Sequence, residues 1–310
     1  MVQTATGINE TERQRALDAL HIVGSLPEPA YDDIVKVAAA VCGTPMALVS
    51  LVDRDRQWFK ARAGLESVQT ERNVAVCDHA IRQPTQLMEV GDLSQDARFA
   101  DNPMLKDLGA RFYAGMPLVT EGGAAVGSVC VIDVNPRELN PTQRDALQAL
   151  ARLTMTLMES RSREREQQVA AIIDHAVAAE ASTAADGAGA YTVVILELQD
   201  LSALAQRLGE RALDRQLQQL DQLLERCLQP ERGDSINRVT GSGEFVAMLA
   251  RGDASETVAK FEEVARDLSQ STGASLLFGA ASTHSAEPAT TVFLRADQAL
   301  SAAKDAAARQ

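Results

Sequence analysis

Aromatic and basic residues are scarce in this sequence. Aromatic side chains make up 4% of the 310 residues, and 43 aspartates and glutamates outnumber the 30 lysines and arginines, which gives a formal net charge of −13. Nucleic-acid binding depends on basic side chains that neutralise phosphates. The charge therefore disfavours nucleic acid as a direct partner, and an anionic membrane for the same reason.

Long hydrophobic runs are also missing. No uncharged apolar stretch reaches about 18 residues, the length that a membrane helix needs. The first residues, Met1 to Arg13, contain no apolar segment typical of a secretion signal. We therefore expect a cytoplasmic protein with no membrane partner.

The four cysteines are scattered singly, without the close pairs typical of zinc or redox motifs. We expect free thiols that pack in apolar surroundings, and no metal site. Cys77, beside Asp78 and His79, is the candidate reactive thiol. Such reactivity requires an exposed, electropositive site.

The first half of the chain has the pattern of an α+β domain. Helical spacing at 16–23 and 31–41 precedes a predicted hairpin of strands 47–52 and 57–63, and Gly43 stops the second helix. Further strands are predicted at 87–90, 112–120 and 125–133, and a helix begins at Asn140-Pro141. We expect one mostly antiparallel sheet covered by helices.

The closing helix of this domain continues beyond it. Apolar residues keep a three-four spacing on both sides of the polar stretch 160–168, namely Leu147, Leu150, Leu153, Leu157, Val169 and Ile172. This pattern predicts a helical connector, which either pairs as a dimeric coiled coil or runs as a solvated linker. Small residues at 178–189 predict a flexible hinge.

The second half alternates strands and helices in the order β-α-β-β-α-β-α. Strands are predicted at 191–198, 235–240, 245–249 and 274–281, and helices at 202–228, 254–269 and 291–308. This order is typical of a ferredoxin-like sandwich with one extra helix. The fold class is therefore α+β with two domains.

Residues 17–158 resemble a GAF domain, a small-molecule sensory module of bacterial signalling proteins. The resemblance rests on five segments: Cys77-Asp-His-Ala80, Asp96-Ala-Arg-Phe-Ala-Asp-Asn-Pro103, Arg111-Phe-Tyr-Ala-Gly-Met-Pro-Leu118, Gly127-Ser-Val-Cys-Val-Ile-Asp133 and Pro136-Arg-Glu-Leu139. It implies a ligand pocket over the sheet, and the candidate lining residues are Trp58 with Phe112, Cys77, Asp78, His79, Arg98 and Arg111. Alternatively, Arg98 or Arg111 pairs with Asp96 or Asp101 and only pins the loop to the sheet.

A third hypothesis is that this domain is a thiol enzyme. A few GAF domains act as thiol-based reductases, and Cys77 would be the reacting residue here. The local sequence supplies no second cysteine to resolve an intermediate.

Residues 190–310 resemble a GGDEF domain, the fold of diguanylate cyclases, which join two GTP molecules into cyclic di-GMP. The signature segment is Gly241-Ser-Gly-Glu-Phe245, so GSGEF stands where the family has GGDEF. Gly243 thus replaces an acid that helps to hold magnesium, while Glu244 is kept. The first metal ligand of the family is Glu197 here, and Lys304 of the last helix is kept.

Nucleotide-binding positions are altered as well. Of the pair that reads guanine in the family, the asparagine is Ala205 and only Asp214 remains. Cyclases often carry an Arg-x-x-Asp site for the product upstream of the signature, and Arg232 and Asp234 here are one residue too close. A weak nucleotide site and a plain polar loop both fit this segment.

The resemblance implies a signalling protein of the cyclic di-GMP type. Mg²⁺ needs carboxylate ligands in near-octahedral geometry, and Gly243 offers none. We therefore expect a catalytically inactive GGDEF domain that serves as a binding or docking module, with no cofactor. The alternative is a weak or conditional cyclase, for which Mg²⁺ would be required.

Four partners are expected: a second copy of the chain, a small molecule in the GAF pocket, GTP or cyclic di-GMP, and a protein partner. The predicted organisation is an N-terminal tail at 1–16, the GAF domain at 17–158, the connector and hinge at 159–189, and the degenerate GGDEF domain at 190–310.

Overall fold

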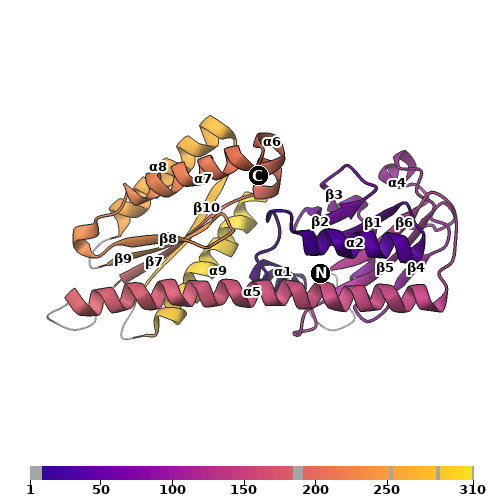
Figure 1. Cartoon of the computed structure of the whole chain (residues 1–310), viewed down its shortest axis with the longest axis horizontal. Coiled ribbons are helices and arrows are strands. Elements are labelled where there is room, and N and C mark those ends of the chain that lie inside the picture. The colour runs from indigo at the N-terminus through magenta and orange to yellow at the C-terminus, as the bar shows by residue number, and fades with distance from the viewer. Residues whose placement is uncertain (1–8, 184–190, 251–253, 284–286, 309–310) are drawn as a thin grey trace. The chain divides into compact units, whose positions relative to one another are not determined.

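The computed structural model describes residues 9–183, 191–250, 254–283 and 287–308 (Figure 1). The chain divides into two compact units, one up to Ser162 and the other from Arg163. Each unit contains one antiparallel sheet, which confirms the predicted two-domain α+β class.

The first unit is built on a six-stranded sheet with the order β3-β2-β1-β6-β5-β4. All neighbouring strands are antiparallel. Every residue of the central strands β1 and β6 is buried, so both faces of the sheet are covered. The strands are β1 Met46–Val52, β2 Arg56–Ala63, β3 Gln69–Glu71, β4 Met88–Val90, β5 Phe112–Val119 and β6 Ala125–Asp133.

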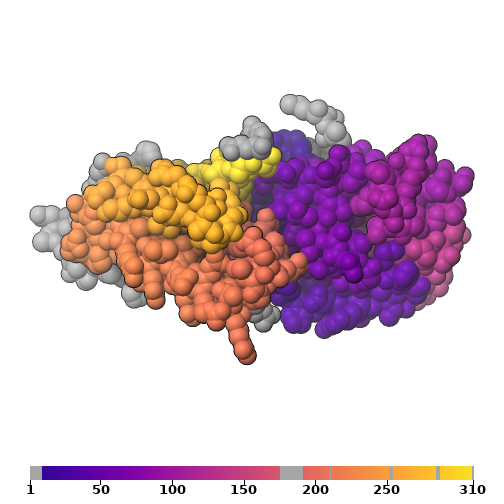
Figure 2. Space-filling model, turned by 90° about the horizontal axis from the view of Figure 1, so that it is seen from above, coloured from indigo at the N-terminus to yellow at the C-terminus, as the bar shows by residue number. Residues whose placement is uncertain are grey.

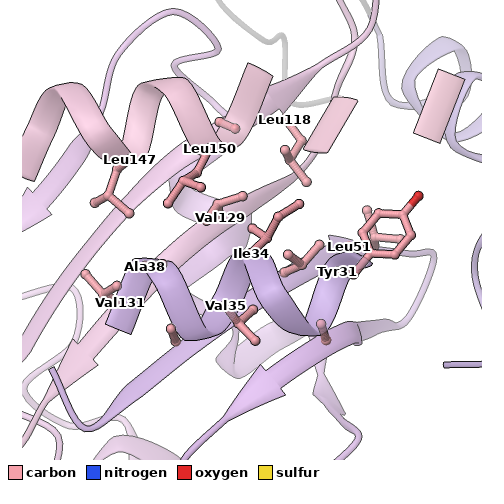
Figure 3. Close-up of a cluster of buried hydrophobic side chains, with 14 of the residues drawn as sticks. Tyr31, Ile34, Val35, Ala38, Leu51, Leu118, Val129, Val131, Leu147 and Leu150 are labelled. Atoms are coloured by element: carbon pink, nitrogen blue, oxygen red, sulfur yellow. The ribbon is translucent and has the colours of Figure 1, made fainter. Parts of the chain in front are cut away.

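Three helices cover one face of this sheet: α1 (Glu10–Ala19), α2 (Pro29–Cys42) and the first part of α5 (Pro141–Thr183). Figure 3 shows Ile34 and Val35 of α2 packed with Leu147 and Leu150 of α5 over the strands. α2 ends at Gly43, whose φ of 63° lies in the left-handed region that glycine adopts without strain. The other face carries the short α3 (Val76–Ala80) and α4 (Pro103–Asp107) with their loops.

α1 begins earlier than the sequence predicted. Asn9 caps it, because its Oδ1 accepts a hydrogen bond from the Glu12 backbone N–H at 2.9 Å while Glu12 Oε2 accepts one from the Asn9 N–H at 3.1 Å. This capping box fixes the helix start at Glu10. Residue 17, the predicted domain boundary, therefore lies inside α1.

The second unit has a four-stranded antiparallel sheet with the order β10-β7-β9-β8, the arrangement of a ferredoxin-like fold. α9 and the second part of α5 cover one face, while α7 and α8 pack side by side over the other (Figures 1 and 2). The elements of the second unit are β7 Tyr191–Leu198, α6 Leu201–Leu208, α7 Glu210–Glu225, β8 Ser235–Arg238, β9 Glu244–Ala250, α8 Ser255–Thr272, β10 Leu276–Ser282 and α9 Ala289–Ala307. Each unit also contains a short 3₁₀ helix, η1 (Arg72–Val74) in the first and η2 (Pro230–Arg232) in the second.

The single helix predicted at 202–228 is two helices. Gly209 has a φ of 80° and a ψ of 153°, which interrupts the helix between α6 and α7. Only glycine adopts such a conformation readily. The apolar spacing continues across the break, so periodicity alone did not reveal it.

α5 is longer than a domain-closing helix. It includes the predicted connector from 159 and the first residues of the predicted hinge, up to Thr183, and the rest of that hinge lies outside the described residues. Among the described helices, none combines the length and apolar character needed to cross a bilayer.

Candidate functional site

A cavity of about 440 Å³ lies on the second face of the sheet in the first unit. Strands β1, β2 and β5 form its floor, and α3 and α4 form its walls. Side chains that line it include Leu48, Gln57, Phe59, Cys77, Met104 and Tyr113. The cavity is mostly apolar with a few convergent polar groups, as is typical of small-molecule sites.

The polar groups of this cavity gather around the sulfur of Cys77. The Tyr113 hydroxyl donates to Cys77 Sγ at 3.3 Å, and Gln57 Nε2 donates to it at 3.4 Å. Cys130 of β6 brings its own Sγ within 3.8 Å of Cys77 Sγ. The local sequence supplies no second cysteine, as stated above, but the fold brings Cys130 to Cys77 from 53 positions away.

Two buried polar atoms near this cluster have no hydrogen-bond partner among the described residues. They are Oε1 of Gln57 and Oγ1 of Thr70, both of which line the cavity. A buried polar atom without a partner costs about 1–3 kcal/mol. A ligand that donates hydrogen bonds here would recover part of that free energy.

The aromatic residues predicted to wall the pocket lie elsewhere. Trp58 and Phe112 belong to the core on the opposite face of the sheet, against the helices. Neighbours in a strand point to opposite faces, so Gln57 and Phe59 line the cavity while Trp58 points away from it. Of the predicted pocket residues, Cys77 is the one that lines this cavity.

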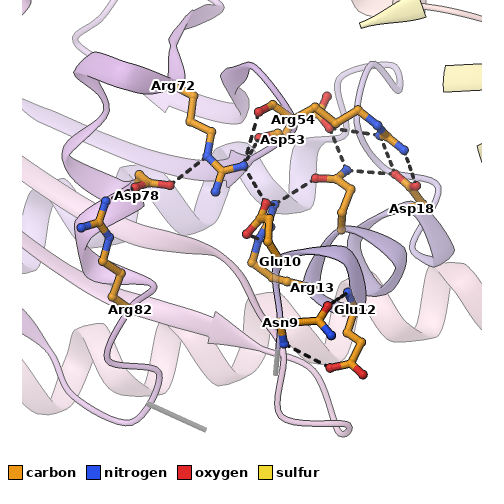
Figure 4. A network of polar contacts seen from close by, with 11 residues as sticks. Asn9, Glu10, Glu12, Arg13, Asp18, Asp53, Arg54, Arg72, Asp78 and Arg82 are labelled. Atoms are coloured by element: carbon orange, nitrogen blue, oxygen red, sulfur yellow. Dashed lines mark hydrogen bonds and ion pairs between the residues drawn. The ribbon is translucent and has the colours of Figure 1, made fainter. Parts of the chain in front are cut away.

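Asp78 is held in an ion-pair network rather than in the cavity (Figure 4). Its carboxylate accepts hydrogen bonds from Arg72 Nε at 2.8 Å and from Arg82 at 2.6 Å, and Arg72 also reaches Glu10 of α1 at 2.7 Å. Burial raises the pKa of Asp78, but the hydrogen bonds from Arg82 and Arg72 outweigh it and leave the pKa lowered. The network ties α3 to α1.

The two predicted arginines also make local ion pairs. Arg98 binds Asp96 at 2.6 Å, as one of the predicted pairings states. Arg111 binds Asp92 at 2.6 Å, an acid that the sequence reading did not consider. The Arg111–Asp92 pair joins the loop to the start of β5, as the loop-pinning alternative states, whereas the Arg98–Asp96 pair lies within the loop.

His79 lies beside the same loop. Its ring meets Phe99 edge to face at 4.9 Å between centroids. Burial is the main cause that lowers the pKa of His79, followed by the charge of Arg82. At neutral pH this imidazole is therefore mostly uncharged.

The second candidate site is the acid pair of the second unit. Glu197 of β7 lies directly opposite Glu244 of β9, so both carboxylates belong to the same face of the sheet. Lys304 of α9 binds Glu197 Oε2 at 2.8 Å, and Gln199 Nε2 donates to Glu197 Oε1 at 3.0 Å. The carboxylate of Glu197 is thus already engaged on both oxygens.

Glu244 forms an ion pair with a residue that was not among the predicted site residues. Arg165 of α5 donates two hydrogen bonds to the Glu244 carboxylate, one of them from Nε to Oε2 at 2.6 Å. The side chains of Arg165 and Glu244 are 9% and 4% exposed. Burial lowers the pKa of Arg165, but the charge of Glu244 outweighs it and leaves the pKa raised. No local signal marked Arg165, which lies in a stretch that is polar on every side.

The remaining predicted nucleotide residues do not gather in one place. Asp214 is exposed on α7 and Arg232 is exposed in η2. Asp234 accepts hydrogen bonds from the backbone N–H groups of Gln229 and Ala250, both at 3.0 Å. Asp234 therefore stabilises the turn before β8, as expected for the plain-loop alternative.

Gly243 lies against the end of β7. A Cβ atom at this position would be 3.1 Å from Leu198 Cβ and 3.1 Å from Leu201 Cδ1, closer than ordinary van der Waals contact. A larger residue at 243 therefore requires these leucines to move. Within the described parts of the chain, no three acidic, histidine or cysteine side chains gather as metal ligands.

Two known family models match the chain, one over each of the two domains. The family model for the GAF domain matches residues 27–157, and the model for the diguanylate cyclase GGDEF domain matches residues 170–310. The chain consists of a GAF domain followed by a GGDEF domain. This order is the predicted one.

A curated relative is a cyclic di-GMP phosphodiesterase of Pseudomonas aeruginosa, 40% identical over 151 residues. The match covers 47% of this chain but only 25% of that relative, so the chain spans about a quarter of its length.

Solved structures match each domain separately. The GGDEF domain of DgcB from Caulobacter crescentus in complex with c-di-GMP is 22% identical, with a TM-score of 0.38, and covers 44% of this chain and 82% of that chain. The PixJ GAF domain of Thermosynechococcus elongatus is 14% identical, with a TM-score of 0.39, and covers 54% of this chain and 99% of that chain.

Proposed function

We propose that this protein is a cytoplasmic signalling protein of the cyclic di-GMP type, in which a GAF domain senses a small molecule and a GGDEF domain binds or docks without catalysing cyclase chemistry. The GGDEF relative that binds c-di-GMP and the curated phosphodiesterase support the signalling class. The engagement of both site carboxylates by cations supports the loss of catalysis.

The ion pairs of Glu197 and Glu244 carry this proposal. A cyclase must hold magnesium with carboxylates to activate a 3′-hydroxyl and to neutralise phosphates. Here Lys304 and Arg165 occupy these carboxylates, and Gly243 contributes no ligand. A metal ion would have to displace two cations, one of them buried, so the domain is proposed to act without a cofactor.

α5 is the proposed route by which the GAF domain reports. In the first unit, Arg161 donates to the backbone carbonyl of His21 at 2.7 Å and Ser162 donates to that of Ala19 at 3.0 Å. In the second unit, Arg165 of the same helix holds Glu244. One helical turn separates these contacts, so a small movement of α5 would change both.

A second copy of the chain and a further protein are the proposed macromolecular partners. Leu153 and Leu157 of α5 are 56% and 37% exposed, whereas Leu147 and Leu150 are buried in the core. The exposed pair lies one turn apart on one face of the helix. This apolar face is the proposed dimer contact.

One observation favours a conditional cyclase as the second candidate function. Glu197 and Glu244 lie directly opposite each other across β7 and β9, as two ligands of one metal ion would. In this alternative, withdrawal of Arg165 frees Glu244, and Mg²⁺ then joins the two acids. Activity would depend on the state of α5.

Calorimetric titration of the whole protein with GTP distinguishes the two functions. The binding proposal predicts that Mg²⁺ leaves the affinity for GTP unchanged within about twofold, and that titration with cyclic di-GMP shows saturable binding. Glu244→Gln is the matched variant, because its amide oxygen still accepts one hydrogen bond from the buried Arg165 while the charge that a metal needs is removed. Magnesium-dependent GTP binding that Glu244→Gln abolishes would contradict the proposal.

A further inference from the structure

Two cysteines of the GAF domain lie in contact although they are distant in sequence. Cys77 comes from α3 and Cys130 from the middle of β6, and their sulfurs are 3.8 Å apart. Both side chains are buried, at 1% and 0% exposure, so Cys77 lacks the exposed, electropositive site expected from the sequence and can be reached only through the cavity that it lines. Disulfide formation requires the two sulfurs to approach from 3.8 Å to about 2.05 Å.

The surroundings make the two thiols unequal. Cys77 accepts hydrogen bonds from Tyr113 and Gln57, and such bonds favour the thiolate. The hydrogen bond from Cys130 lowers the pKa of Cys77, and it outweighs burial, which raises it. The same contact, together with burial, raises the pKa of Cys130. Cys77 is thus the better nucleophile and Cys130 remains a protonated neighbour.

Access also differs between the thiols. Cys77 lines the 440 Å³ cavity, whereas Cys130 lies behind it in the sheet. Cys42 is packed in the core on the opposite face, where burial raises its pKa to about 11. Among the four cysteines, Cys77 alone combines a cavity, donors to its sulfur and a second thiol in contact.

We propose that Cys77 and Cys130 form a reversible disulfide when a small hydroperoxide enters the GAF cavity. Cys77 attacks the peroxide, an S–O bond forms, the O–O bond breaks, and the leaving oxygen takes a proton to become water or an alcohol. The sulfur of Cys130 then attacks Cys77, an S–S bond forms, the S–O bond breaks, and hydroxide leaves with the proton of Cys130 as water. Two electrons pass from the two thiols to the peroxide, and a dithiol restores them by exchange.

The bond would act on the ion-pair network described above. A disulfide fastens α3 to β6, and Asp78 follows Cys77 on α3. Asp78 holds Arg72, which holds Glu10 of α1 (Figure 4). The redox state of the cavity is therefore linked by direct contacts to the helix whose end meets Arg161 and Ser162 of α5.

The test uses the full-length native protein and hydrogen peroxide. After graded exposure, catalase stops the reaction, N-ethylmaleimide blocks the remaining thiols before unfolding, and peptides are mapped without reductant. The expected product has two thiols fewer, with the peptides of Cys77 and Cys130 joined, and dithiothreitol restores both thiols. Cys42 and Cys227 are expected to stay reduced at the same peroxide concentration.

Three variants sharpen the result. Cys130→Ser should stop the reaction at a sulfenic acid on Cys77 that dimedone traps, Cys77→Ser should remove the fast reaction, and Cys42→Ser should react like the wild type. The mapping of the native protein does not depend on how well the variants fold. The proposal is overturned if Cys77 ends as a sulfinic acid without the cross-link, if both thiols stay reduced, or if Cys42 reacts as fast.

Discussion

The two candidate sites differ in whether their polar groups have hydrogen-bond or ion-pair partners. In the GAF domain, polar atoms of Gln57 and Thr70 beside a cavity have no hydrogen-bond partner among the described residues. In the GGDEF domain, Glu197 and Glu244 are each matched to a cation. The polar atoms of the first site can still accept hydrogen bonds from a ligand, whereas the carboxylates of the second site are already paired.

This difference separates the roles of similar residue types. A buried charge without a partner costs several kcal/mol, so the carboxylates of this acid pair need cationic partners when no metal ion is bound. Arg165 and Lys304 are those cations here. These ion pairs thus stabilise the second unit, whereas the cavity of the first unit keeps polar atoms without hydrogen-bond partners among the described residues.

Removing Arg165 should have the largest effect on stability. Arg165→Ala leaves Glu244 buried and charged, so we expect the GGDEF domain to lose about 3–5 kcal/mol of unfolding free energy. Urea denaturation followed by circular dichroism measures the loss. Arg163→Ala is the matched control, because Arg163 is exposed on the same helix. A loss below about 1 kcal/mol for Arg165→Ala would show that the pair is not structurally important.

Restoring the missing acid should destabilise the domain without restoring activity. Gly243→Asp introduces a Cβ that is 3.1 Å from Leu198 and Leu201, and we expect a loss of about 1–3 kcal/mol from this overpacking. Gly243→Ala adds the same Cβ without the carboxylate and should lose a similar amount.

Cyclase activity should need at least Gly243→Asp, Glu197→Asp and Ala205→Asn together, because metal ligands and guanine contacts act as one unit. Chromatography of the nucleotides measures turnover. Robust turnover by Gly243→Asp alone would contradict this expectation and would identify a recently silenced enzyme.

The network at Glu10 should give a smaller, pH-dependent effect. Burial raises the pKa of Glu10, but the hydrogen bonds from Arg13 and Arg72 have the larger combined effect. The net result is a pKa lowered to about 2. A carboxyl group with a lowered folded-state pKa stabilises the protein above its unfolded pKa, and this stabilisation is lost as pH falls from about 4.5 to about 2. Because Glu10 is 47% exposed, we expect only about 1 kcal/mol.

Denaturation of the wild type and of Glu10→Gln, at pH 7 and at pH 2.5, measures this contribution. The difference between the two proteins should shrink at the lower pH. Glu66→Gln, at an exposed position, should show no such change. An equal difference at both pH values would rule out the ionised Glu10 as the stabilising species.

The smallest effect on folding is expected at the exposed leucines of α5. Leu153→Glu/Leu157→Glu should leave the unfolding free energy within about 0.5 kcal/mol, since both side chains are exposed at the surface of α5, Leu153 by 56% and Leu157 by 37%. If the dimer forms through this face, light scattering will show a monomer for the variant and a dimer for the wild type. A variant that remains dimeric places the contact elsewhere.

Local signals were sufficient to predict most of the fold. Gly43 ends α2 and Asn140 precedes α5 as predicted, and the strand pairs β1–β2 and β5–β6 are antiparallel hairpins. Each of these features depends on residues within a few positions of one another. The break at Gly209 was missed because one glycine inside a continuing apolar pattern is compatible with either a break or an intact helix.

The site contacts were harder to predict because they join distant residues. Cys77 was selected from the sequence, but its contact with Cys130 depends on the register of β6. Arg165 was not selected, since its partner Glu244 lies 79 positions away. Trp58 was assigned to the pocket, but strand alternation turns it to the other face. Residue type indicated the candidates, and three-dimensional pairing decided their roles.

The proposed absence of cyclase activity is tested most directly by the conversion of GTP by the purified full-length protein. Incubation with GTP and either Mg²⁺ or Mn²⁺, followed by mass spectrometry, measures cyclic di-GMP. Because Arg165 and Lys304 hold the carboxylates and Gly243 supplies no ligand, we expect no product above that of a Glu244→Gln control. Clear turnover by the wild type that the Glu244→Gln control lacks would contradict it.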